Sequence, residues 1–180
     1  MNSLHDLLAI RRSIRQYKNE PLTPEEVKTI LEAGLLSPTG KNCRAWHFIA
    51  VDNPEMLQRL SECKASGAGP VARCALAVVV AVDITASTTW VEDASIAAAY
   101  MMLQARDLGI GSCWIEVNAR LAADGTPAED IVSELLGLPE QIQPLCIVTF
   151  GYPDEDRKPQ NTDKLLWERV HLGTFRPEQC

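Results

Sequence analysis

The chain has 180 residues, of which 46% are hydrophobic and 23% are charged. This composition is typical of a globular protein, and the length is sufficient for one sizeable core. No change in composition and no linker divides the sequence, so we expect a single domain over residues 1–180. The formal net charge of −7 argues against a general nucleic-acid binder or a protein of anionic membrane surfaces.

The six cysteines are spread along the chain without paired spacing, and several lie in apolar runs, where a thiol behaves as a small hydrophobe. The first residues lack the charged-then-apolar layout of a secretory signal. We therefore expect free thiols and a cytoplasmic protein. No Cys-x-x-Cys pair is present and the three histidines are far apart in the sequence, so no metal site is predicted.

The first half of the chain is predicted to contain three helices and two strands. Leucines at helical spacing indicate a helix over residues 3–10. Thr23-Pro24-Glu25-Glu26 combines an N-cap, a proline at the first helical position and a glutamate three residues after the cap, so a helix begins there and ends near Leu36. The remaining elements are a strand over 46–51, a helix opened by Asn53-Pro54, and a strand over 74–82 that is apolar enough for burial on both faces.

The second half is predicted to contain two helices and two strands. The longest helix runs from about Trp90 to Leu108, and its charged residues exclude a membrane span. Thr126-Pro127 is expected to begin another helix in the same way as Thr23-Pro24, with Gly137 as its C-terminal cap. Strands are expected over residues 110–117 and 145–150. The pattern as a whole predicts helices and strands mixed around one sheet.

Four segments carry residues that core packing does not explain. Arg11-Arg12-Ser13-Ile14-Arg15 gathers three guanidinium groups, whose planar fork matches phosphate. The loop over residues 37–46 mixes turn formers with amide, amine and guanidinium donors that suit a heteroaromatic ring. The other two are residues 109–117 and Gly151-Tyr152-Pro153 followed by Arg157-Lys158. Each has a plain alternative: a solvated turn, a surface loop, a helix cap or a strand-end turn.

In order and spacing these segments resemble the nitroreductase family of FMN-dependent oxidoreductases, specifically its small single-domain members. The resemblance extends from about residue 5 to about residue 160. Its most specific parts are Arg-Arg-Ser-x-Arg with Tyr17 after it, and the Ser-Pro-x-x-x-Asn loop that leads into Trp46-x-Phe48. A Gly-x-Gly-x-x-Trp segment and the Gly-Tyr-Pro complete the set.

The resemblance implies an α+β fold with a mainly antiparallel central sheet flanked by helices and completed in a homodimer. It also implies FMN as cofactor. Arg11 and Ser13 would contact the phosphate and ribityl chain, with Arg12 alongside, and Arg15 would approach the pyrimidine edge of the flavin. The remaining implied contacts are a loop from the partner subunit (Pro38, Thr39, Gly40 and Asn42), the backbone facing the flavin N5 (Ile115, Glu116 and Val117) and further phosphate cations (Arg157 and Lys158).

Two positions depart from the family's pattern. Many relatives have Gln-Pro where this chain has Arg44-Ala45, which adds a cation near the expected substrate opening. Relatives often have glycine where this chain has Val117, so a backbone hydrogen bond from that residue to N5 is in doubt.

The function implied is a ping-pong oxidoreductase that passes hydride from NAD(P)H through N5 to an electron-poor acceptor: a nitroaromatic, a quinone or a flavin. The flavin carries the chemistry, so no catalytic side chain is required. An FMN-binding or flavin-storage protein without turnover is the alternative, and a family member with different flavin chemistry is a third. The apolar tail (Leu165, Leu166, Trp167, Val170, Leu172 and Phe175) would be buried either on a partner subunit or on its own sheet.

Overall fold

The computed structural model describes residues 3–175. The strands are β1 (Trp46–Val51), β2 (Leu76–Asp83), β3 (Gly111–Glu116) and β4 (Ile142–Gly151). The α-helices are α1 (Leu4–Ile10), α2 (Pro24–Leu35), α3 (Pro54–Leu60), α4 (Trp90–Asp107) and α5 (Ala128–Leu136). Short 3₁₀ turns are η1 (Gly40–Asn42), η2 (Val71–Arg73), η3 (Thr162–Lys164) and η4 (Trp167–Arg169).

The four strands form one sheet in the order β1-β2-β4-β3, and every neighbouring pair is antiparallel. The predicted α+β class is therefore confirmed. β2 lies inside the sheet and all its residues before Asp83 are buried, as its apolar run indicated. β4 begins at Ile142, earlier than predicted, because it continues along β2 past an irregularity between Val80 and Ala81. Strand β3 is left at an edge of the sheet.

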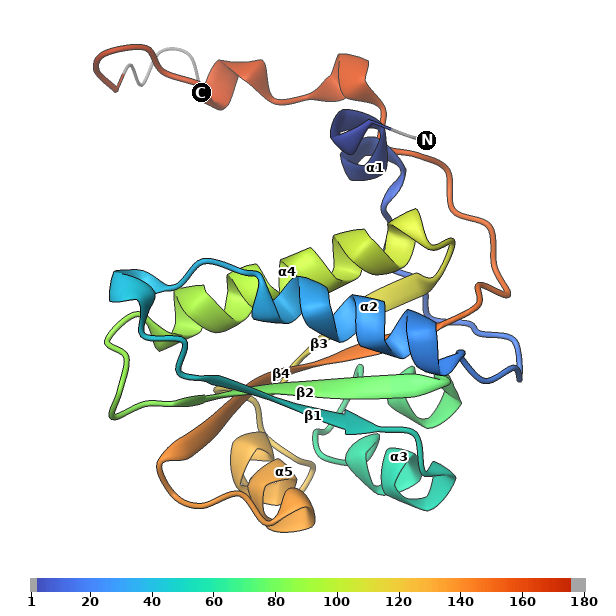
Figure 1. Ribbon diagram of the computed structural model, residues 1–180, viewed down its shortest axis with the longest axis vertical. Helices are drawn as coiled ribbons and strands as arrows, with labels where there is room; N and C mark the ends of the chain where they lie inside the picture. Colours follow the sequence, from blue (N-terminus) through green and yellow to red (C-terminus); the bar gives the residue numbers. More distant parts are fainter. Residues whose placement is uncertain (1–2, 176–180) are drawn as a thin grey trace.

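Helices cover both faces of the sheet (Figure 1). α2 and α4 lie together on one face, and α3 and α5 lie on the other. The first layer is centred on side chains such as Met101 and Phe150, and the second on Leu57 and Val132. No helix within residues 3–175 is long and apolar enough to cross a membrane. The cysteines at 43, 63, 74, 113 and 146 are free thiols, while Cys180 lies outside the described residues.

Three of the helix starts follow from local sequence. Ser3 and Thr23 each form a capping box, and the Asn53 side chain accepts the Met56 N–H. The expectation for Thr126 is wrong, since it caps no helix and α5 begins at Ala128. The reason is tertiary: the Thr126 carbonyl accepts the Ala122 N–H at 2.8 Å, which keeps the backbone extended up to Pro127.

After β4 the chain leaves the sheet and runs past α1 to the far end of the molecule (Figure 1). The Gln160 N–H donates to the Ala9 carbonyl at 2.8 Å, which ties the start of this tail to α1. The six apolar side chains of the tail are 50% to 87% exposed. The alternative that the tail packs on its own sheet is therefore wrong.

Candidate functional site

The arginine-rich segment lies along the outer edge of β3. α1 ends at Ile10, and the extended chain that follows pairs Ser13 with Ser112, so that the Ile14 N–H donates to the Ser112 carbonyl at 2.9 Å. A Cβ at Gly111 would lie 2.8 Å from the Cβ of Ile14. The second glycine of Gly-x-Gly is thus explained by this close packing of the segment against β3.

The buried Tyr17 side chain holds the arginine-rich segment against the sheet. Its hydroxyl lies 2.6 Å from the Ile14 carbonyl oxygen, to which it donates, and 2.7 Å from the Thr149 hydroxyl. Burial raises the pKa of Tyr17, so the phenol remains a neutral donor. A Cβ at Gly151 would lie 2.9 Å from the Tyr17 ring, which explains why a glycine ends β4. The Tyr17 of the first motif and the Gly-Tyr-Pro of the last one therefore meet.

The chain after β4 runs back along the same segment. The Asp154 N–H donates to the Gln16 carbonyl at 3.0 Å, and the Arg12 guanidinium donates to the Lys158 carbonyl. The Glu155 carboxylate accepts the Arg15 N–H at 2.5 Å and pairs with Arg157 through its other oxygen. Sequence positions separated by about 140 residues are thus joined, and the two cationic clusters predicted from the sequence lie together.

A small cleft of about 170 Å³ opens between these segments. Its lining includes four arginines, two carboxylates and two small residues of β3: Arg11, Arg12, Arg106, Arg157, Glu155, Asp156, Gly111 and Ser112. Arg106 comes from the last turn of α4 and was missed in the sequence. Its Nε is buried and has no hydrogen-bond partner among the described residues. Such an orphaned donor beside three other guanidinium groups fits an anionic oxygen ligand, as a phosphate group would supply.

At its Glu116 end, β3 also has free backbone groups on its outer edge, the edge away from β4. Because residues 112, 114 and 116 alternate with their neighbours, Glu116 directs its N–H and C=O away from β4. The Glu116 carbonyl accepts a hydrogen bond from Lys64 Nζ at 2.9 Å, and its N–H faces the same edge. The Val117 N–H instead donates to the Leu145 carbonyl at 3.1 Å. Of the three residues 115–117, Glu116 is the one whose N–H a ligand on that edge can use.

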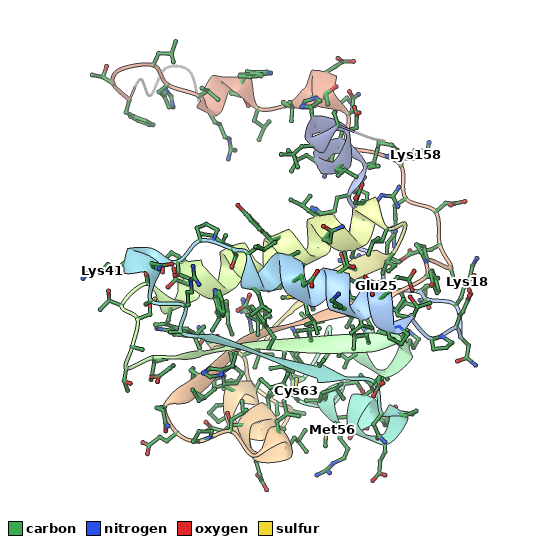
Figure 2. All side chains as sticks on the ribbon, in the orientation of Figure 1. Lys18, Glu25, Lys41, Met56, Cys63 and Lys158 are labelled. Carbon is green, nitrogen blue, oxygen red and sulfur yellow. The ribbon has the colours of Figure 1, made fainter. Side chains whose placement is uncertain are left out.

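Lys64 contacts this end of the edge, whereas Arg15 follows the residues that pair with Ser112. Burial raises the pKa of the Cys113 thiol on β3, and the charges of Arg15 and Lys64 oppose that rise. Burial lowers the pKa of Lys64. Arg15 was predicted from the sequence, whereas Lys64 was not, since it lies in a loop of small residues with no motif around it. Figure 2 shows the neighbouring Cys63 beneath the sheet.

The loop over residues 38–42 lies at the other end of the molecule. Lys41 in this loop and Lys158 in the cationic cluster appear on opposite sides of Figure 2. Within the loop, the Thr39 hydroxyl accepts the Arg44 N–H at 3.1 Å, and the Asn42 side-chain carbonyl accepts Arg44 Nε at 3.0 Å. One chain therefore does not bring Pro38, Thr39, Gly40 and Asn42 to the arginine cleft.

The sequence profile of the nitroreductase family matches residues 8–90 and 78–152. The chain belongs to the nitroreductase family. It is 41% identical to an FMN-dependent nitroreductase from Clostridium difficile R20291, whose structure superimposes with a TM-score of 0.92 over 94% of this chain and 98% of that one.

Sequence relatives agree with this assignment. An Archaeoglobus fulgidus protein with the provisional name NADH dehydrogenase/NAD(P)H nitroreductase is 36% identical over 92% of this chain and 94% of its own length. A Staphylococcus haemolyticus NADPH-dependent oxidoreductase is 27% identical over 93% of this chain and 71% of its own. The resemblance noted in the sequence is confirmed, and this nitroreductase-family chain is an oxidoreductase by membership.

Proposed function

We propose that this nitroreductase-family protein binds FMN along the outer edge of β3 and uses it to pass hydride from NAD(P)H to an electron-poor acceptor in a ping-pong reaction. The observation that carries the proposal is the arginine cleft at one end of that edge and the Glu116 N–H at the other. Ser112 and Glu116 are four residues apart, or roughly 13 Å in an extended strand. One elongated ligand with an anionic end and a hydrogen-bonding ring would span both.

The cleft would hold the phosphate. Arg11, Arg12 and Arg157 were assigned to this end from the resemblance, and Arg106 adds the orphaned Nε. Ser13 pairs with Ser112 beside the cleft, where its hydroxyl would reach the ribityl chain. Guanidinium groups bind phosphate through charge-assisted hydrogen bonds, which are stronger than those between neutral groups. In this arrangement Lys158 contributes its backbone carbonyl, which orients Arg12.

The ring would lie at the Glu116 end. A bound FMN would supply hydride transfer at N5, so the protein's part would be to position the ring and to stabilise its charge. The Glu116 N–H would donate to N5, and Arg15 would stabilise the negative charge that reduction places on the pyrimidine side. Val117 has no role in this scheme beyond packing, because its N–H is already bonded inside the sheet.

A homodimer would complete the site. The loop of Pro38, Thr39, Gly40 and Asn42 lies away from the cleft of its own chain, and a second copy would bring its loop to this one. Exposed apolar side chains support the dimer: besides those of the tail they include Leu4 and Leu8 of α1 and Ile96 and Tyr100 of α4. Exposed apolar side chains that gather in one region are typical of an interface between subunits. The occupant proposed is a second copy of this chain.

The test is to purify the protein with its flavin and to add NADPH or NADH under anaerobic conditions. We expect the yellow colour to bleach and to return when a quinone, a nitroaromatic or free flavin is added. A protein that holds FMN but is reduced by neither nicotinamide would favour the flavin-storage alternative. A protein that binds no FMN would contradict the proposal altogether.

A further inference from the structure

The loop over residues 39–44 has an unusual backbone. Lys41, Asn42 and Arg44 have φ values of 51°, 55° and 50°, a left-handed conformation that costs residues with a Cβ on the order of 1 kcal/mol or more each. Hydrogen bonds within the loop, from Arg44 to Thr39 and Asn42, stabilise part of this conformation. A contact from outside the loop can hold it in addition.

The buried carboxylate of Asp93 provides that hold. Asp93 lies in the first turns of α4 and is 3% exposed, and it is the one buried carboxylate within residues 3–175. Its Oδ1 accepts the Gly40 N–H at 2.7 Å, and its Oδ2 accepts hydrogen bonds from the Ser87 hydroxyl at 2.8 Å and the Cys43 thiol at 3.5 Å. Two of these three donors belong to the 39–44 loop.

The negative charge is stabilised by neutral donors. The Thr89 hydroxyl also points at Oδ2, at 3.2 Å, and no cation pairs with Asp93 among the described residues. Burial raises the pKa of Asp93, but the hydrogen bonds from Gly40, Ser87, Cys43 and Thr89 outweigh it and lower the pKa overall. The start of an 18-residue helix further favours a negative charge.

Gly40 is fitted to the same arrangement. A Cβ at this position would lie 2.2 Å from the Thr89 hydroxyl oxygen, so a side chain would push the loop off Asp93. The Gly40 N–H is also committed to Asp93 and is not available to a ligand. A glycine at position 40 therefore allows the loop to pass close to Thr89 and Asp93. Other residues of the loop would make the contact with a ligand.

We infer that Asp93 is a positioning residue for the flavin site of the partner subunit: by binding Gly40 and Cys43 it holds the 39–44 loop in the strained form that reaches across the dimer. This inference rests on the proposed function. Asp93 is remote from the cleft of its own chain, so its effect should appear in the other subunit of the dimer. Loss of Asp93 damages the site of the neighbour and leaves the cleft of its own chain intact.

The experiment uses heterodimers purified by two different tags. An Asp93→Ala homodimer should remain a dimer and bind FMN at least tenfold more weakly than the wild type. In a heterodimer of Asp93→Ala with Arg11→Ala, one site combines the intact cleft of the first chain with the intact loop of the second. That heterodimer should bind one FMN per dimer with an affinity close to that of the wild type. Asp107→Ala, an exposed aspartate at the other end of α4, is the matched control.

A heterodimer with no tight site would overturn the inference, because Asp93 would then serve only its own subunit. Wild-type affinity in the Asp93→Ala homodimer would overturn it as well. If Asp93→Ala does not fold, Gly40→Ala replaces it in the same pairing, with the same expected stoichiometry. Failure of the wild type to bind FMN or to dimerise would instead contradict the proposed function.

Discussion

The carboxylate of Glu155 accepts the backbone N–H of Arg15 at 2.5 Å, and this bond joins the two cationic segments of the site. The same oxygen accepts the Gln16 N–H at 3.2 Å, while the other oxygen pairs with Arg157. An acidic side chain thus organises the site that we propose binds an anion. Its charge keeps Arg157 in place and its oxygens hold the backbone of the arginine-rich segment.

Glu155 makes the stability of the site depend on pH. The Arg15 N–H and then Arg157 lower the pKa of Glu155 against the opposing effect of burial. A lowered pKa in the folded state contributes stability above the ordinary pKa and loses it as pH falls through the lowered value. We expect Glu155→Gln to reduce Tm at about pH 7 and the difference from the wild type to shrink below about pH 4. Glu140→Gln, in an exposed turn, should show no such pattern in thermal melts.

Arg106 is predicted to bind the phosphate group. Arg106→Gln should weaken FMN binding by about tenfold to a hundredfold, the range of a lost charge-assisted hydrogen bond. Riboflavin, which lacks the phosphate, should bind equally well to the variant and the wild type. Titration with both flavins measures this, and Arg59→Gln on the exposed face of α3 is the control. Equal losses for both flavins would place Arg106 away from the phosphate.

Arg15 is predicted to stabilise the reduced flavin. Arg15→Ala should make the midpoint potential of bound FMN more negative, by about 30 mV for each tenfold loss in relative binding of the reduced form. Arg11→Ala should weaken FMN binding with little change in potential, since the phosphate does not change charge on reduction. Spectroelectrochemical titration compares the two. An unchanged potential in Arg15→Ala would refute this division of roles.

The buried contact between Tyr17 and Thr149 is predicted to stabilise the fold beneath the site. Tyr17→Phe leaves the Ile14 carbonyl and the Thr149 hydroxyl without this partner, which should cost about 1–3 kcal/mol of unfolding free energy. Thr149→Val should cost less, because Val matches its shape. Denaturant unfolding of the two single variants and the double variant should show coupling of about 1 kcal/mol. Strict additivity would mean that the two hydroxyls do not interact.

The exposed tail is predicted to lie in the dimer interface. Leu166→Glu places a charge on a side chain that is 55% exposed in the single chain. Burial of that charge against a second copy would be costly, so the variant dimer should have a larger dissociation constant than the wild-type dimer. Sedimentation velocity measures this. Ala72→Glu, which adds the same charge at an exposed residue of η2 on the opposite side of the sheet, should leave the dimer intact.

The sequence alone determined the elements whose cause is local. Thr23 and Asn53 cap their helices because a side-chain oxygen close in sequence satisfies the first free N–H groups. β2 could be recognised because burial on both faces demands an unbroken apolar run. The arginine-rich segment stood out because like charges at neighbouring positions need an anionic partner, wherever in the fold it lies.

Tertiary structure decided the features that depend on residues far apart in the chain. A lone arginine at the end of an apolar helix looks like an ordinary C-terminal cation, and only the packing of α4 beside β3 places Arg106 in the cleft. Lys64 meets the Glu116 carbonyl across 52 positions, and Asp93 meets Gly40 across 53. Thr126 failed as a cap because a backbone pairing with Ala122 took precedence. Local sequence patterns show which charged and hydrogen-bonding groups require a partner. The tertiary structure decides which residue becomes that partner, because the two can lie more than 50 positions apart in the chain.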